Sequence, residues 1–261
     1  MDDGAVAGRV AWIAVAPVKG MSLALIDEAE LTEAGIVGDR RFFLVDENNR
    51  LVNAKGLGVL QKIRPEYDDA GRTLTLFMPD GDAISDTVET GHEVETNFWG
   101  DPKPGLVVTG PWSDAISDLA ARNLRLVEAK DSAPDRGRSG AVSLVSTAAL
   151  ASLAAELGVD EVDGRRFRMH FGIDGVASHA EDGWIGRSVA VGAAVVVPQG
   201  NVGRCAVTTQ NPDSGMPDLD TLKALARYRG EVETTEPLPF GVYASVAQPG
   251  RIRVGDALSV L

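Results

Sequence analysis

Short apolar segments that end at glycine or proline run through most of this sequence of 261 residues, which contains 29 glycines and 13 prolines. Clear cases are residues 9–18 (RVAWIAVAPV), 73–81 (TLTLFMPDG) and 189–200 (VAVGAAVVVPQG). Such segments are typical of strands, and turn residues at regular intervals between them indicate a barrel or a sandwich. We therefore predict a β-rich α/β (α+β) protein rather than a helical bundle.

Three segments show the apolar spacing of amphipathic helices instead. One begins at Ser113 as a serine cap, a second covers residues 144–158 and ends at Gly158, and a third covers residues 218–230. Residues 130–140 form a polar, glycine-rich loop before the second helix. Further strands are predicted at residues 23–31, 165–174 and 205–209.

The length of the chain and a change in its pattern of predicted strands and helices indicate two domains. A chain of this length can bury a full core, and length alone allows either two modest domains or one large one. The pattern changes from all-β to mixed strand and helix between residues 120 and 128. We expect one domain over residues 1–125 and a second over residues 126–261.

The formal charge of −13 at pH 7 limits the partners of this protein. An acidic surface repels nucleic acids and anionic lipids, so we expect it to bind neither. The N-terminal segment carries Asp2 and Asp3 where a signal peptide is basic, and Pro17 interrupts its short apolar stretch, so it is typical of neither a signal peptide nor a membrane span. A single cysteine allows no intramolecular disulfide, which predicts a cytoplasmic protein.

That cysteine, Cys205, lies in the stretch GRCAVTTQNPDSG. Arg204 precedes it, and positive charge beside a cysteine favours the reactive thiolate. A polar turn with Asp213 follows and could bring backbone N–H groups toward a ligand. A lone cysteine is most often a small buried apolar residue, so a structural role stays open beside a functional one.

A nucleophilic cysteine needs a base, and His92, His170 and His179 are the three histidines of the sequence. The spacing pairs none of them with Cys205. One thiol cannot form a zinc site, which needs about four ligands. A single thiolate suffices when a cofactor brings the other ligands, as in molybdenum held by the dithiolene of a pterin. The phosphate of such a cofactor requires cationic and hydroxyl groups around it.

Basic residues gather in a few short segments of this acidic chain. Any one of them is most often a solvated surface charge, but as a set they fit a phosphate-bearing cofactor. Ser139 and Gly140 could add donors to an anion. The basic residues concerned are Lys19, Arg40, Arg41, Arg136, Arg138, Arg165, Arg166, Arg168 and Arg204.

Together these motifs resemble those of a known family. Residues 126–261 resemble the MOSC domain through RFRMHFGIDG, AEDGWIG, GRCAVTTQNPDSG, LKALARYR and FGVYASVAQPGRIRVGDAL. The N-terminal half is similar to the β-barrel domain that often precedes it, through APVKG, EAELTEAGIVGDRRFFLVD and NAK. The resemblance implies an N-terminal β-barrel-like domain followed by a MOSC β-barrel with peripheral helices. Within the family, the chain resembles the amidoxime-reducing components.

The resemblance implies a role for each matching residue. Cys205 would be the molybdenum ligand, and Cys205 and Asp213, the latter beside the metal, would be the catalytic residues. Departures from the family pattern are Gly20, Lys55 and His170, which stand where serine, arginine and asparagine are common. Residues expected to bind the molybdenum cofactor (molybdopterin with Mo) are Lys19, Arg41, Ser139, Arg168, Arg204 and Thr208.

The function implied by the resemblance is an oxidoreductase that reduces N-hydroxylated or related N-oxygenated small molecules. Its electrons would come from a separate ferredoxin-, flavin- or haem-type protein. An alternative is a sulfur-carrier or cofactor-handling module, in which Cys205 carries a persulfide or passes on the cofactor. A third possibility is a member without cofactor, in which Cys205 is structural.

Overall fold

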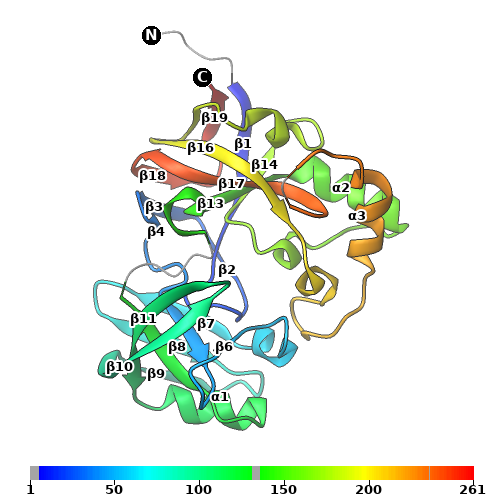
Figure 1. Cartoon of the computed structure of the whole chain (residues 1–261). Helices are drawn as coiled ribbons and strands as arrows, with labels where there is room; N and C mark the ends of the chain where they lie inside the picture. Colours follow the sequence, from blue (N-terminus) through cyan, green and yellow to red (C-terminus); the bar gives the residue numbers. More distant parts are fainter. Residues whose placement is uncertain (1–5, 131–135, 235) are drawn as a thin grey trace.

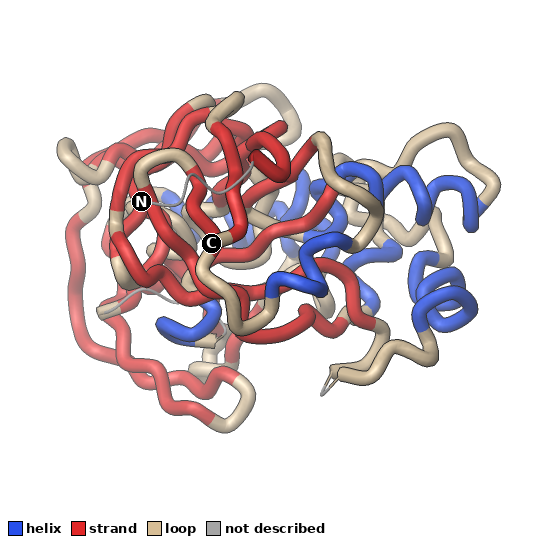
Figure 2. Tube along the Cα trace, turned by 90° about the horizontal axis from the view of Figure 1, so that it is seen from above, coloured by secondary structure: helices blue, strands red, loops and turns tan. Residues whose placement is uncertain are grey.

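The computed structural model describes residues 6–130, 136–234 and 236–261, so residues 131–135 of the predicted polar loop lie outside it. The predicted β-rich α/β class is confirmed. Figure 1 shows two β-rich bodies, an upper one that contains β1 (Val6–Val15) and β19 (Ala257–Val260) and a lower one with α1 (Trp112–Ala120) at the bottom. Seen from above in Figure 2, most helical segments gather on one side of the molecule. No helix among the described residues is long and apolar enough to cross a membrane.

The upper body is a closed barrel of seven strands, because β1 pairs with β14 and completes the order β14-β13-β17-β16-β15-β19-β1. Buried apolar side chains such as Ile13, Leu144 and Val242 form its core, and each contributes about 1.5–3 kcal/mol. The strands are β1 (Val6–Val15), β13 (Val142–Ser146), β14 (Phe171–Asp174), β15 (Val189–Val191), β16 (Ala194–Gly203), β17 (Pro239–Gln248) and β19 (Ala257–Val260).

The first strand of the chain is therefore part of the C-terminal barrel. In β1, Ile13 pairs with Phe171 on one side, and Arg9 pairs with Ala257 on the other. A short strand, β2 (Ala24–Ile26), extends the sheet beside β1. A small separate sheet contains β18 (Gly250–Arg253), β3 (Glu28–Thr32) and β4 (Gly35–Ile36).

The described residues of the lower body form two sheets, the α-helix α1 and the 3-10 helix η1 (Gly58–Lys62). Trp112 at the start of α1 (Trp112–Ala120) is fully buried, and its indole N–H donates to the carbonyl of Leu74 at 3.2 Å. One sheet has the order β10-β11-β12-β5-β6 and the other β7-β8-β9. The strands are β5 (Phe42–Val45), β6 (Leu51–Val52), β7 (Arg64–Asp68), β8 (Thr73–Phe77), β9 (Ala83–Thr87), β10 (Glu89–Phe98), β11 (Asp101–Thr109) and β12 (Arg125–Ala129).

Strand pairing crosses the predicted boundary at residues 125 and 126 in both directions. β1 belongs to the barrel of the C-terminal half, and β12 belongs to the sheet of the N-terminal half through its pairing with β5. The remaining helices are α2 (Thr147–Leu157), α3 (Thr221–Arg229) and the 3-10 helices η2 (Gly137–Gly140), η3 (Gly164–Phe167), η4 (Ala180–Trp184) and η5 (Ala206–Thr209).

Five local predictions need correction. The helix expected to begin with Ser113 as its cap begins at Trp112 with Pro111 at the cap position, so Ser113 lies inside α1. The strand expected at residues 205–209 is the 3-10 helix η5, because the hydroxyls of Thr208 and Thr209 donate to carbonyls three residues back. Residues 165–174 are strand only from Phe171, after η3. The helix expected over residues 144–158 starts at Thr147, because β13 continues to Ser146. The strand expected at residues 23–31 is two strands, β2 and β3.

Candidate functional site

Cys205 follows the end of β16 and carries the only thiol of the chain, which is exposed. The backbone on both sides of it is held in place. The Arg204 N–H donates to the Pro237 carbonyl at 3.2 Å, and the Thr208 N–H donates to the Cys205 carbonyl at 3.1 Å. The thiol is therefore presented to solvent on a fixed loop, not buried as a small apolar residue.

Arg204 directs its side chain into the protein. Its guanidinium donates to the Phe167 carbonyl at 2.8 Å and to the Phe240 carbonyl at 3.0 Å. It also lies over the Phe167 ring, with 5.2 Å between its central carbon and the ring centroid. Burial lowers the pKa of this guanidinium. Arg204 thus anchors the segment that carries the thiol.

The segment after Cys205 packs against a loop of the N-terminal half. The Gln61 amide donates to Gln210 at 2.6 Å, and Gln210 donates to the Ala54 carbonyl at 3.1 Å. Gly215 has φ +71°, and a Cβ there would lie 1.9 Å from the Gly58 carbonyl oxygen. Only glycine allows the two backbones to approach so closely. The two halves of the chain therefore meet beside Cys205.

Arg166 holds the segment after Cys205 in place from its buried side. Its buried guanidinium bonds both Asp218 oxygens, at 2.6 and 2.8 Å, and donates to the Gln210 carbonyl at 2.8 Å. Thr208 is buried too, and its hydroxyl lies 2.8 Å from that of Thr221. Both side chains hold the loop in shape, and neither is directed to solvent.

Lys19 and Arg168, predicted from distant segments, meet at one turn. Arg168 donates to the Met21 carbonyl at 2.7 Å, and Met21 closes a turn onto Val18 that contains Lys19. The Lys19 ammonium is largely buried and lies 5.4 Å from the centroid of the Phe98 ring. Arg168 has φ +54°, a conformation that costs a non-glycine residue energy and is frequent at functional sites.

A buried network behind this turn was not foreseen from the sequence. His170 Nε2 lies 2.9 Å from the Asp39 carboxylate, and His170 Nδ1 lies 3.0 Å from the Ser143 hydroxyl. Arg40 contacts Asp39 and His170, and donates to the Arg168 carbonyl at 3.2 Å. The Gly-Asp-Arg-Arg sequence at residues 38–41 was the one sequence signal for this network. It did not show that Arg40 is the arginine that contacts His170 and the Arg168 carbonyl.

The charges of this network follow from its burial. Burial raises the pKa of Asp39, but Arg40 and His170 outweigh that effect and hold it below its ordinary value. Burial lowers the pKa of His170, and the nearby Asp39 carboxylate only partly offsets this. The network therefore contains an ionised Asp39, a positive Arg40 and a neutral His170 at neutral pH.

The other predicted residues have protein partners of their own. Arg41 donates to Glu128 at 3.0 Å, and Arg72 bonds the same carboxylate. Asp213 bonds Arg165 at 2.8 Å. Ser139 is exposed, and its hydroxyl donates to the Arg136 carbonyl at 2.8 Å.

The loop of Ser139 is tied to the strand that precedes Cys205. Arg136 pairs with Glu236, and Glu236 accepts the Gly203 N–H at 2.7 Å. One region thus contains Cys205, Arg204, Thr208 and the Ser139 loop. The adjoining turn contains Lys19 and Arg168. Arg41 instead faces Glu128. Among the described residues, no group of three or more histidine, cysteine and acidic side chains could hold a metal ion.

Comparison with known proteins matches both halves of the chain. A family model for the MOSC domain matches residues 131–259, and one for the MOSC N-terminal beta barrel domain matches residues 7–124. Mitochondrial amidoxime-reducing component 1 of Xenopus laevis is 26% identical over 290 residues, which cover 95% of this chain and 81% of the relative. Molybdenum cofactor sulfurase 2 of Aedes aegypti is 25% identical over 227 residues, 84% of this chain and 28% of that protein. The YUAD protein from Bacillus subtilis has a solved structure with 13% identity and a TM-score of 0.49, covering 97% of this chain and 94% of that one.

Proposed function

The chain belongs to the MOSC domain family, and from this membership we propose that it is a molybdenum-cofactor-dependent reductase. Its relatives support a function related to the molybdenum cofactor. The finer proposal is that it reduces N-hydroxylated or related N-oxygenated small molecules. Electrons would come from a separate redox protein of the ferredoxin, flavin or haem type.

The observation that carries this proposal is the exposed thiol at the meeting point of the two halves. A soft thiolate suits molybdenum, and the pterin dithiolene would complete the ligand set without further protein sulfur. Cationic side chains of Lys19 and Arg168 around one turn suit the phosphate of the cofactor. The residues present therefore fit this group.

In this proposal each residue has a defined task. Cys205 would bind the metal, and Lys19 and Arg168 would bind the phosphate. The Ser139 hydroxyl donates its proton to the Arg136 carbonyl, so its oxygen would accept a hydrogen bond from the pterin. Arg204 and Thr208 hold the cysteine loop in position. Asp213 lies on the metal side, where its pair with Arg165 orients it, and Arg41 supports the turn through its own pair with Glu128. The bound cofactor would supply the redox chemistry, and the protein would supply binding and orientation.

A second candidate function follows from the exposure of the thiol. An accessible cysteine on a fixed loop could carry a persulfide, or bind the cofactor and pass it to a client enzyme. The named function of the sulfurase relative favours this alternative. It predicts transfer of sulfur or cofactor without reductase turnover.

The test is reductase activity of protein produced in a host that makes the cofactor. Benzamidoxime serves as the N-hydroxylated substrate and reduced methyl viologen as the electron donor. We expect turnover with the wild type, none with Cys205→Ser, and unchanged turnover with Met216→Leu, an exposed control on the following loop. A fully loaded wild type without turnover, together with a persulfide on Cys205 by mass spectrometry, would replace this proposal by the alternative.

A further inference from the structure

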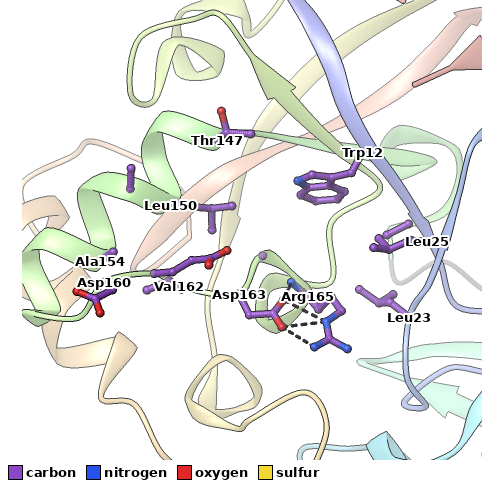
Figure 3. A pocket seen from close by; sticks show the side chains of 14 residues that line it. Trp12, Leu23, Leu25, Thr147, Leu150, Ala154, Asp160, Val162, Asp163 and Arg165 are labelled. Atoms are coloured by element: carbon purple, nitrogen blue, oxygen red, sulfur yellow. Dashed lines mark hydrogen bonds and ion pairs between the residues drawn. The ribbon is translucent and has the colours of Figure 1, made fainter. Parts of the chain in front are cut away.

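An open apolar pocket of about 450 Å³ lies on the outer side of the barrel, between β1, α2 and the approach to η3. Figure 3 shows Trp12 and Leu150 facing each other across it, with Leu23 and Leu25 on one side and the Asp163–Arg165 pair below. A pocket of this size, mostly apolar and with a few polar groups, is typical of sites for small organic molecules.

The position of Trp12 keeps the pocket open. A Cβ at Gly172 would lie 2.1 Å from the Trp12 indole, so the ring packs against the backbone only because residue 172 is glycine. A Cβ at Gly164 would lie 3.2 Å from the ring, a tight contact that the glycine avoids. Leu25 at the edge stays 62% exposed. The pocket thus offers an apolar wall.

The rim of the pocket is acidic. Its lining contains Asp160, Glu161, Asp163 and Arg165, which gives three negative charges and one positive charge. Arg165 is engaged by Asp163 at 2.9 Å and by Asp213 at 2.8 Å. Asp160 and Glu161 have no ion pair or hydrogen bond with other side chains in the described part of the chain. Their charge therefore favours a cationic occupant.

We propose that this pocket binds small aromatic cations, of the amidinium or protonated amine class. The ring of the ligand packs between Trp12 and Leu150, and its positive group lies at Asp160 and Glu161. The indole face adds a cation–π attraction where the charge approaches it. This site needs no cofactor and does not depend on the proposed function. Arg165 connects it to the loop of Asp213, beside the candidate molybdenum site.

The first test compares three probes by isothermal titration calorimetry on the full chain prepared without cofactor. Benzamidine is the cation, benzamide its neutral counterpart and benzoate the anion. We expect one-to-one binding of benzamidine, weaker binding of benzamide and no binding of benzoate. Benzoate binding as tightly as benzamidine, or the absence of benzamidine binding, would overturn the proposal.

The second test locates the site with variants at exposed positions. Asp160→Asn with Glu161→Gln should weaken benzamidine about two- to thirtyfold, because each exposed ion pair is modest. Glu47→Gln with Asp118→Asn removes the same charge elsewhere and should leave affinity unchanged. On α2, Ala151→Phe fills the pocket and should abolish binding, while Ala155→Phe, outside the lining, should not. Wild-type affinity in the Ala151 variant would overturn the assignment to this pocket.

Discussion

Replacing Arg166 by methionine tests whether this residue holds the cysteine loop. The guanidinium of Arg166 makes two bonds to Asp218 and one to the Gln210 carbonyl. Methionine keeps an apolar chain in the same space but offers no donor. Asp218 loses a charged partner, and the Gln210 carbonyl loses a hydrogen bond.

The expected loss in the free energy of unfolding depends on the solvent exposure of each partner. The Arg166 side chain is 5% exposed, but that of Asp218 is 38% exposed, so water can replace part of the lost pair. A fully buried broken pair costs about 3–5 kcal/mol, and a hydrogen bond to a charged group about 1.5–3 kcal/mol. We therefore expect a loss of about 2–4 kcal/mol. For a chain of this size that lowers the melting temperature by about 5–15 °C.

The assay is calorimetric melting combined with hydrogen exchange of residues 206–219. The variant should melt lower, and the amides of this segment should exchange about tenfold faster or more. Arg227→Met is the matched control, because its pair with Glu156 is 58% and 32% exposed and should contribute at most about 1 kcal/mol. An Arg166 variant that melts and exchanges like the control would refute the role of this residue.

Three further outcomes are expected. Arg168→Ala should weaken cofactor retention about ten- to hundredfold with the fold intact, and normal occupancy at limiting cofactor would contradict this. A fragment of residues 126–261 lacks β1, which pairs with both β14 and β19, so it should show no cooperative melting by circular dichroism; a cooperative transition would show that the barrel closes without that strand. Because burial lowers the pKa of both His170 and His179 in the folded state, the unfolded chain takes up their protons first as pH falls below about 6.5. Each histidine then lowers the stability by at most about 1.4 kcal/mol per pH unit. His170→Asn should remove the His170 share of that slope in urea melts between about pH 5 and 6.5, and an unchanged slope would exclude His170 as one of its sources.

Local features of the fold could be predicted where one residue type decides them. Gly158 ends α2 at φ +70°, as its position after an apolar helical stretch indicates. The β-rich class follows from short segments and frequent turns. Barrel closure by β1 was beyond such reasoning, because the partners of this strand are more than 150 residues away. Only the packing of the whole chain selects them.

The candidate site shows the same limit. The single cysteine and the family motifs indicated Cys205, and the basic segments indicated Lys19 and Arg168. The family motif indicated Arg41, yet Arg40 is the arginine that contacts His170 and the Arg168 carbonyl. The directions of the two side chains depend on the turn at Arg40, which has φ +47°. The Asp39–His170 contact joins residues 131 positions apart and has no local signal.

The most direct test of the proposed cofactor site is the molybdenum X-ray absorption spectrum of the purified protein, compared with that of Cys205→Ser. The account predicts molybdenum close to one atom per wild-type chain, with sulfur ligands from the pterin and one from the protein. In the serine variant, which exchanges a soft thiolate for a hard hydroxyl, one sulfur ligand should be lost. Identical spectra for the two proteins, or a wild type that takes up no molybdenum in a competent host, would contradict the account.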